Sequence, residues 1–428
     1  MNPKYSLSFS QELLDSTLKE QRKLFLKHDL GIQRNILNQI SKIIKSPQIV
    51  IITGLRRVGK STLLAQLAHK YLKNNFYYVN FEDDRLLDFQ LKDFNLLHQS
   101  LIKLFGQKKT FLFDEIQNIP QWERFVRRLH DRGYKFIITG SNASLLSQEL
   151  GTRLTGRSIK INLYPFSFKE FLSFKKQPIP NIKKLNKKQR KKLLKLVNQY
   201  LILGGIPDAL KYPKLNIHKN LYDDVLYRDI TTRYKIDNQK SLKELTFYLV
   251  SNSSSQISYN KLKNLLKLGS VNTVKNYIDY LENSWLFFIL NKYAYSIKEQ
   301  QIANKKIYSI DTGLVNSVGF SFSKNKGKMM ENVVFLQLKQ NNNDIYFYKS
   351  QQNHEVDFFL HKDKSFIQVS QNIDNTETRN REIRSLIESA QEQSSTKLQI
   401  ISEQHKEIVK QKKMKIFITP LYEWLLQQ

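Results

Sequence analysis

Eight residues near the N-terminus constrain this chain more than any other segment. Residues 54–61 read Gly-Leu-Arg-Arg-Val-Gly-Lys-Ser. The apolar run Ile49–Thr53 precedes them, as expected for a buried parallel strand, and Leu63, Leu64 and Leu67 follow at helical spacing. A strand, a glycine-rich turn and a helix in that order aim backbone amides from a helix N-terminus at an anion. The sequence therefore predicts a Walker A phosphate-binding loop inside an α/β fold.

This loop predicts a nucleoside triphosphate, ATP, as ligand. The ammonium of Lys60 is expected to reach the β and γ phosphates, and the hydroxyl of Ser61 to bind Mg²⁺. The predicted nucleotide-binding set is Gly54, Leu55, Arg56, Arg57, Val58, Gly59, Lys60, Ser61 and Thr62.

A second motif lies about fifty residues after the first, a spacing read from the printed sequence. The segment Phe111–Glu115 is an apolar strand that ends in two acids, the form of a Walker B motif. We expect Asp114 to hold Mg²⁺ and Glu115 to polarise the attacking water, because one carboxylate can serve the metal while the other serves the nucleophile.

Further candidates follow the Walker B strand. Asn142, or Ser141 beside it, is expected to sense the γ phosphate, although both residue types also favour the start of a helix. Arg153 and Arg157 are candidates for stabilising charge on a transferring phosphoryl group, and each could equally be a surface or salt-bridge arginine.

Strand-like and helix-like patterns alternate over the first part of the chain, which predicts a parallel sheet covered on both faces. The ligand is expected where the strands end and the helices begin. The predicted strands are Ile49–Thr53, Phe76–Phe81, Thr110–Phe113, Lys135–Thr139 and Ser158–Leu163.

Charge is the other strong signal. The chain has 69 Lys and Arg against 38 Asp and Glu, a net charge of +31. Such a balance favours a polyanionic partner, and we expect nucleic acid, with DNA favoured; an anionic membrane surface and a lysine-rich compositional bias are the alternatives.

There is no cysteine, the apolar runs are too short to span a bilayer, and Met1–Tyr5 lacks a signal-peptide core. We expect a cytoplasmic protein without membrane insertion.

Two later segments suit contacts with nucleic acid. Residues 171–207 contain no acid and many lysines, either a solvated helix face or a phosphate-binding surface. Ile257–Leu268 and Val271–Glu282 read as two helices joined by Gly269 and Ser270, which predicts a helix-turn-helix or an ordinary helical hairpin. Trp285–Leu290 and Lys292–Ser296 are the expected strands of a wing.

The order of these motifs is specific. The chain resembles prokaryotic predicted ATPases of the AAA+ superfamily that carry a restriction-endonuclease-like C-terminal domain of the DUF4143 type. The resemblance rests on residues 54–61, 80–83, 111–117, 139–142, 154–157, 163–172, 204–207, 311–314, 331–332, 355–358 and 367–369.

The resemblance implies an α/β AAA+ core with a helical lid, a winged-helix-like segment and a nuclease-like α/β domain, and it favours Arg157 as an arginine acting across the boundary of a homo-oligomer. The expected domains are an N-terminal arm (1–30), the ATPase core (31–165), the lid (166–238), the winged-helix-like segment (239–297) and the nuclease-like domain (298–428).

The C-terminal domain departs from a working nuclease pattern. Glu331, Asp357 and Gln368 match the metal-binding positions that the resemblance implies, but Ser370 stands where a lysine is expected. Gln368 brings no charge, and Lys349 and Lys362 are the candidates to replace the lysine. We therefore expect a degenerate site that does not cut DNA efficiently.

Together, these features predict an ATP-hydrolysing protein that acts on or with nucleic acid. An ATP-gated switch that docks a protein is the alternative, and an ATP-regulated nuclease is a lesser one.

Overall fold

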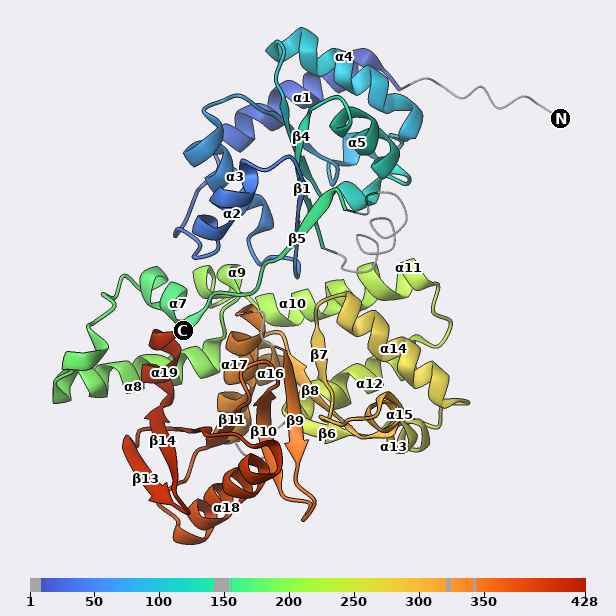
Figure 1. Cartoon of the computed structure of the whole chain (residues 1–428). Helices are drawn as coiled ribbons and strands as arrows, with labels where there is room; N and C mark the ends of the chain where they lie inside the picture. The colour runs from blue at the N-terminus through green and yellow to red at the C-terminus, as the bar shows by residue number, and fades with distance from the viewer. Residues whose placement is uncertain (1–8, 142–153, 155, 321–324, 342–343) are drawn as a thin grey trace. The chain divides into compact units, whose positions relative to one another are not determined.

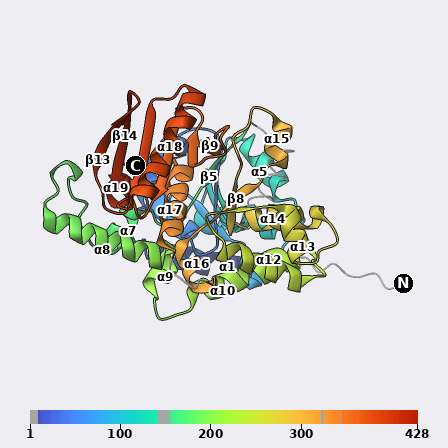
Figure 2. The same ribbon diagram turned by 90° about the horizontal axis from the view of Figure 1, so that it is seen from below.

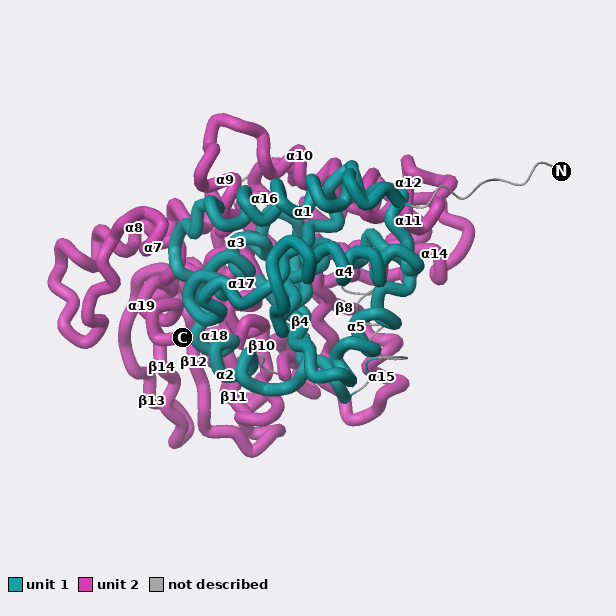
Figure 3. The backbone as a smooth tube through the Cα atoms, turned by 90° about the horizontal axis from the view of Figure 1, so that it is seen from above, with its two compact units in different colours: residues 1–163 teal, residues 164–428 magenta. Residues whose placement is uncertain are grey.

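The computed structural model of the chain describes residues 9–141, 154, 156–320, 325–341 and 344–428 (Figure 1). Contacts between residues divide the chain into two compact units, residues 1–163 and 164–428, which Figure 3 shows in different colours. Each unit is described by itself. Within the described ranges, no helix is long and apolar enough to cross a membrane.

Unit 1 is a parallel sheet with helices around it. Its strands are β1 (Ile49–Thr53), β2 (Tyr77–Asn80), β3 (Thr110–Asp114), β4 (Lys135–Gly140) and β5 (Ser158–Asn162). They lie in the order β2-β3-β4-β1-β5, and every neighbouring pair is parallel. All five predicted strands are therefore present, displaced by at most one residue at either end.

The helices of unit 1 are α1 (Gln11–Leu26), α2 (Leu37–Ile44), α3 (Lys60–Leu67), α4 (Phe94–Phe105) and α5 (Trp122–His130), with a π-helical turn (Ala68–Leu72) continuing α3 and short 3₁₀ turns at Asp84–Leu86, Leu91–Asp93 and Ile116–Asn118. The core is rich in phenylalanine, and Phe111 stacks on Phe136 across neighbouring strands. Leu14 and Leu18 of α1 are part of this core. The N-terminal arm predicted over residues 1–30 is thus wrong for residues 11–26, which form a packed helix.

Unit 2 begins with a helical region: α7 (Phe168–Phe174), a 3₁₀ turn (Ile182–Lys184), α8 (Lys187–Leu203), α9 (Pro207–Lys211), α10 (Ile217–Asp224), a π-helical turn (Val225–Thr231), α11 (Thr232–Tyr234) and α12 (Gln239–Ser251). Asn186 caps α8 through the backbone amide of Gln189. The carboxylate of Asp311 accepts a 2.6 Å hydrogen bond from the amide of Gly205. This hydrogen bond connects the landmark segments 204–207 and 311–314 of the sequence.

A small antiparallel sheet follows. It contains β6 (Ser255–Ile257), β7 (Phe287–Leu290) and β8 (Lys305–Ser309) in the order β6-β8-β7. Between β6 and β7 lie α13 (Tyr259–Leu265) and α14 (Val271–Asn283), and α15 (Ile297–Ile302) precedes β8.

Two predictions about this segment are wrong. The first helix starts at Tyr259, because Ser255–Ile257 is a strand. The partner of β7 is β8 rather than Lys292–Ser296, in which only Lys292 forms an isolated bridge, to Phe347. The predicted boundary between residues 297 and 298 would therefore separate strands of one sheet.

The last part of unit 2 is a mixed sheet in the order β13-β14-β12-β11-β10-β9. Helices α17 and α18 cover opposite faces of this sheet, since Phe358 of β10 contacts Phe335 of α17 while the adjacent Phe359 belongs to the core beneath α18 (Figure 2). The elements are α16 (Thr312–Val318), α17 (Lys326–Gln340), β9 (Ile345–Lys349), β10 (Glu355–Leu360), β11 (Ser365–Ser370), α18 (Thr376–Gln393), β12 (Lys397–Ser402), β13 (Glu407–Gln411), β14 (Met414–Pro420) and α19 (Leu421–Gln427).

Candidate functional site

The predicted phosphate-binding loop lies at the carboxyl end of β1 and leads into α3. Gly59 is the N-cap of α3 and has φ +94°, a conformation that side chains disfavour. A Cβ atom on Gly54 would lie 2.3 Å from the carbonyl oxygen of Leu163. Both glycines are therefore required by the backbone, and the free amides at the start of α3 are positioned for an anion.

Lys60 is buried at the centre of this loop, with 5 % of its surface exposed. Its Nζ donates to the carbonyl oxygens of Gly54 and Leu55 at 3.3 and 3.2 Å and lies 3.1 Å from Oε1 of Glu115. The ammonium is thus held by the loop itself, beside the carboxylate of the second motif. A phosphate would offer it a stronger anionic partner.

Asp114 is a buried carboxylate at the end of β3. It accepts hydrogen bonds from Ser61, from Thr139 and, at 3.2 Å, from the hydroxyl of Tyr78. Burial raises the pKa of Asp114, and the charge of Glu115 adds to this shift. A buried carboxylate that is costly to ionise, next to a serine hydroxyl, is a donor set that fits Mg²⁺.

Glu115 has a left-handed backbone, with φ +51°. Its Oε2 accepts a 2.5 Å hydrogen bond from Nε2 of Gln117, which also donates to the hydroxyl of Ser141 at 3.3 Å. Burial opposes the ionisation of Glu115, but the charge of Lys60 and the hydrogen bond from Gln117 outweigh it and lower the pKa. Glu115 is therefore an oriented, ionised carboxylate at neutral pH.

The structure adds residues that the sequence analysis missed. Thr139 donates to Asp114 and accepts from the amide of Glu115 at 3.1 Å, so it fixes both acids. Arg34 is buried behind the loop, and its Nη1 donates to the carbonyl of Val58 at 2.9 Å. His28 lies 2.9 Å from the hydroxyl of Thr62. No local pattern in the sequence indicated the contacts of Thr139, Arg34 or His28.

The arginine candidates fall elsewhere. Arg56 pairs with Glu82 at 2.9 Å, and Arg57 is exposed.

Arg157 pairs with Asp131 at 3.2 Å, and its carbonyl accepts from the amide of Ile49, the first residue of β1. It therefore lies at the amino end of the strands, opposite the phosphate-binding loop of its own chain. Asn142 and Arg153 lie outside the described residues.

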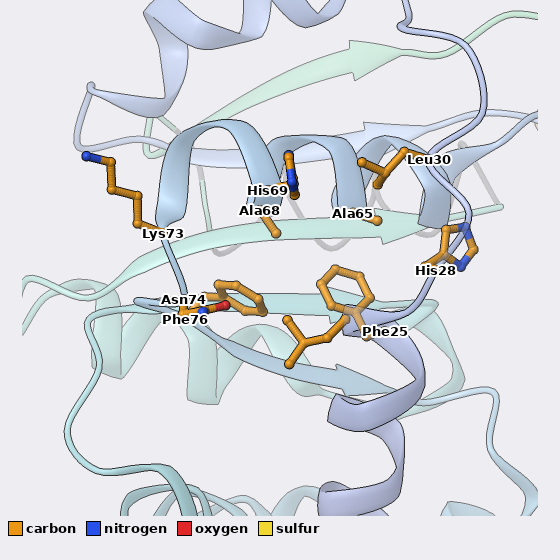
Figure 4. Close-up of a pocket in the computed structure, with 10 residues that line it drawn as sticks. Phe25, His28, Leu30, Ala65, Ala68, His69, Lys73, Asn74 and Phe76 are labelled. Carbon is orange, nitrogen blue, oxygen red and sulfur yellow. The ribbon is translucent and has the colours of Figure 1, made fainter.

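A pocket of about 380 Å³ lies beside α3. Figure 4 shows Ala65, Ala68 and His69 on one wall and Phe25 and Phe76 on the other. His28, which contacts Thr62, is also in its lining. The sequence analysis did not predict this pocket.

The three C-terminal candidates come together in unit 2, but not as a metal-binding triad. Glu331 of α17 and Asp357 of β10 both contact the ammonium of Lys306, at 2.9 and 2.8 Å. Gln368 instead accepts a 3.1 Å hydrogen bond from the amide of Asp357. The lysine at this cluster is thus Lys306 of β8, rather than Lys349 or Lys362 as the sequence suggested.

Comparisons with known proteins identify the parts of the chain. Residues 46–172 match the family described as an AAA domain. Residues 194–325 and 326–424 match two domains of unknown function, DUF8612 and DUF4143. The uncharacterized protein MJ1544 of Methanocaldococcus jannaschii is 34 % identical over 435 residues, which cover 97 % of this chain and 96 % of that protein. This chain belongs to the same family as MJ1544.

Two further similarities complete the comparison. An uncharacterized protein of Haemophilus influenzae is 32 % identical over 356 residues, which cover 79 % of this chain and 85 % of that protein. The solved structure of the Aeropyrum pernix ORC2 protein in its ADP form is 12 % identical and has a TM-score of 0.34, over 63 % of this chain and 90 % of that one. The matched families thus place an AAA domain first, a DUF8612 domain after it and a DUF4143 domain last.

Proposed function

We propose that this member of the MJ1544 family binds ATP with Mg²⁺ and hydrolyses it to ADP and phosphate. The observation that carries the proposal is the convergence of Lys60, Asp114 and Glu115 at one end of the parallel sheet, with Lys60 3.1 Å from Glu115. These three polar groups, which would bind phosphate, metal and water, thus come from the loop after β1 and from the end of β3, two strands away in the same sheet.

Each group has a separate task in hydrolysis. Lys60 exchanges Glu115 for the β and γ phosphates, and the amides of α3 bind the same oxygens. Ser61 and Asp114 would hold Mg²⁺, which would neutralise charge on the phosphates. Glu115, released from Lys60 and still held by Gln117, orients the attacking water and accepts its hydrogen bond.

The test is an ATPase assay with and without Mg²⁺, using the wild-type chain and Asp114→Asn. We expect turnover that requires Mg²⁺ and that Asp114→Asn abolishes. Wild-type turnover by Asp114→Asn would show that the assay measures something other than this site.

We further propose that the second unit contacts DNA. The element order α12, β6, α13, α14, β7, α15, β8 supports a helix-turn-helix followed by a wing of β7 and β8, with α15 in the connection between these two strands. Val274, Ile278 and Leu281 of α14 are buried, while Asn272, Lys275 and Asn276 are exposed and available for a groove. Helix α8 adds exposed cations at Lys187, Lys188, Arg190, Lys191, Lys192 and Lys195.

A matched pair of variants tests the DNA proposal. Replacing Lys187, Lys188, Lys191 and Lys192 with Gln removes four charges from α8, and replacing the exposed Lys410, Lys412, Lys413 and Lys415 removes four from the hairpin of β13 and β14. Only the α8 variant should weaken DNA binding and flatten its dependence on salt. Equal losses in both would reduce the effect to net charge, and no binding by the wild type would favour the protein-docking switch.

Arg157 is proposed to act on the ATP of a neighbouring copy, since it lies far along the strands from its own loop. A mixture of Lys60→Ala and Arg157→Ala should recover ATPase activity that neither variant has alone, because mixed boundaries contain one intact Lys60 and one intact Arg157. Absence of recovery would assign Arg157 to its pair with Asp131 only.

A further inference from the structure

The second unit contains a buried lysine that the ATPase proposal does not use. Lys306 lies on β8 with 3 % of its surface exposed. Its Nζ lies 2.9 Å from Oε1 of Glu331, 2.9 Å from Oε1 of Glu355 and 2.8 Å from Oδ1 of Asp357. An ammonium has three N–H donors, so three carboxylates satisfy it completely.

The carboxylates are themselves held in place. Oε1 of Glu331 accepts from the hydroxyl of Tyr308 at 2.7 Å, and Oδ2 of Asp357 accepts from the amide of Val369 at 2.9 Å. The other oxygen of Glu355 accepts from the side-chain amide of Gln256. Oxygens fixed on α17 and β10 therefore converge on a single point, and that point is a nitrogen cation.

Three carboxylate oxygens around one point are also the kind of donor set that binds a divalent ion, although among the described residues no group of acids and histidines is placed to hold one as it stands. Oxygen ligands surround Ca²⁺ at about 2.3–2.6 Å and Mg²⁺ at about 2.0–2.1 Å, so a small inward shift of the same three oxygens would close around a metal. The ammonium and a metal ion cannot share the position, because both are cations. Burial opposes the charge of Lys306, but Asp357 and Glu331 outweigh it and raise its pKa, so the lysine stays protonated.

Lys306 also joins two parts of the unit. Strand β8 belongs to the small sheet that matches one domain family, whereas Glu331, Glu355 and Asp357 belong to the DUF4143 domain. Beside the cluster, the side chain of Asn332 accepts from the amide of Ser309 and donates to its carbonyl, both at 2.9 Å. The contacts between β8 and α17 are thus buried and combine these polar groups with the stacking of Tyr308 on Phe335.

We infer that Lys306 is a built-in cation: its ammonium takes the place of a divalent metal ion among Glu331, Glu355 and Asp357, and so turns an acidic site into a joint between the small sheet and the DUF4143 domain. The inference goes beyond the ATPase proposal and is independent of it. Removing Lys306 should therefore create a divalent-cation site that the wild-type chain lacks.

The experiment compares Mn²⁺ binding by the full-length wild type, Lys306→Met and Lys305→Met, without nucleotide. Lys305 is the matched control, because it is buried on the same strand and its Nζ donates to the carbonyl of Gln300. Lys306→Met should bind one more Mn²⁺ than either, and saturating Mn²⁺ should raise its unfolding temperature by about 5–10 °C. Adding Asp357→Asn should remove this gain. Lys306→Met that folds only with Mn²⁺ also supports the inference.

A second measurement needs no lysine variant. Wild type and Asp357→Asn should bind the same number of Mn²⁺ ions, because the ammonium excludes metal from the cluster. One more ion in the wild type, or plasmid cleavage with Mn²⁺ that Asp357→Asn removes, would overturn the inference. So would a folded Lys306→Met that binds no extra Mn²⁺. None of these readouts depends on ATP turnover, so a failed ATPase proposal would be recognised separately.

Discussion

Lys60 and Lys306 are both buried lysines paired with carboxylates, yet their surroundings differ. Lys60 contacts one carboxylate, Glu115, and two backbone carbonyls of the loop that leads into α3. Lys306 contacts three carboxylates and lies on the central strand of a small sheet. The first lysine can change partners without breaking the fold, and the second cannot.

The difference shows how a buried ion pair is to be interpreted. Separating a buried pair leaves an uncompensated charge, so a pair persists in function only where a ligand supplies a replacement. A phosphate can replace Glu115 at Lys60, because both are anions. At Lys306 the replaceable partner is the lysine itself, and its replacement would be a metal ion.

The largest expected effect is at the first lysine. Lys60→Ala should reduce ATP affinity by more than about 100-fold, because a buried charged partner of the phosphates is lost. Glu115→Gln should keep ATP binding and slow hydrolysis by about 10²–10⁴-fold, because the amide cannot accept the proton of water. Equilibrium binding of a fluorescent ATP analogue and single-turnover hydrolysis measure the two steps. Hydrolysis by Glu115→Gln at the wild-type rate would disprove the Walker B assignment.

For the stability of the fold we expect the opposite order, with a larger loss at Lys306 than at Lys60. Lys306→Met should lower the free energy of unfolding by about 3–5 kcal/mol, because the buried carboxylates of Glu331 and Asp357 and the half-buried one of Glu355 lose their counter-ion. Lys60→Met should cost about 1–3 kcal/mol, since Glu115 keeps its hydrogen bond from Gln117. Urea titration, with hydrogen exchange measured in β8 and α3, compares the two. If Lys60→Met lost as much unfolding free energy as Lys306→Met, or more, the two lysines would not differ in the way proposed.

The sequence predicted the site around Lys60 well and missed the one around Lys306. Strand β1 has the predicted bounds, because a strand buried on both faces is a continuous apolar run that follows from local composition. Strand β8 reads Lys-Lys-Ile-Tyr-Ser and is buried throughout, although two lysines argue against a buried strand. The burial of Lys306 is favourable because of Glu331 and Asp357, which are distant in the sequence, whereas Lys305 donates to the nearby carbonyl of Gln300.

The same reasoning covers the smaller omissions. The motif residues Lys60, Asp114 and Glu115 were identifiable because the spacing of the motif carries the chemistry. Thr139 and Gln117 were missed, because their roles arise from hydrogen bonds between neighbouring strands and turns, which no local pattern records. The cluster of Glu331 and Asp357 was found through the resemblance, whereas Glu355 and Lys306 required the structure.

Glu282 offers a contrast to the carboxylates paired with Lys60 and Lys306, because it is a partly buried carboxylate without a strong cationic partner. Its Oε1 accepts from the amide of Ile289 at 2.8 Å. Burial raises its pKa to about 7 from the usual 4.5, and the charge of Lys339 only partly opposes this. In the pH range between these values the native state retains a proton that the unfolded state releases, so stability falls as the pH rises.

Glu282→Gln should remove this dependence. The variant should match the wild type at pH 4 and be more stable at pH 8 by about 1–2 kcal/mol, a value reduced for partial exposure of the side chain. Urea titrations at both pH values give the difference. Glu244→Gln is the control, because Glu244 is an exposed acid on α12. A gap between wild type and Glu282→Gln that is the same at both pH values would exclude titration of this carboxylate.

The smallest expected effect is at Gln117, which tests whether Glu115 must be oriented once Lys60 has left it. Gln117 has 9 % of its surface exposed and donates to both Glu115 and Ser141. Gln117→Leu keeps the bulk but removes the donor, so Glu115 loses its fixed rotamer while remaining a carboxylate. We expect kcat to fall by about 10-fold, at the low end of what such positioning contributes, with KM for ATP and the unfolding temperature unchanged. Asn118→Leu is the matched control, since Asn118 donates to the carbonyl of Phe81 instead. If Gln117→Leu raises KM and leaves kcat intact, Gln117 acts in ATP binding rather than in orienting Glu115.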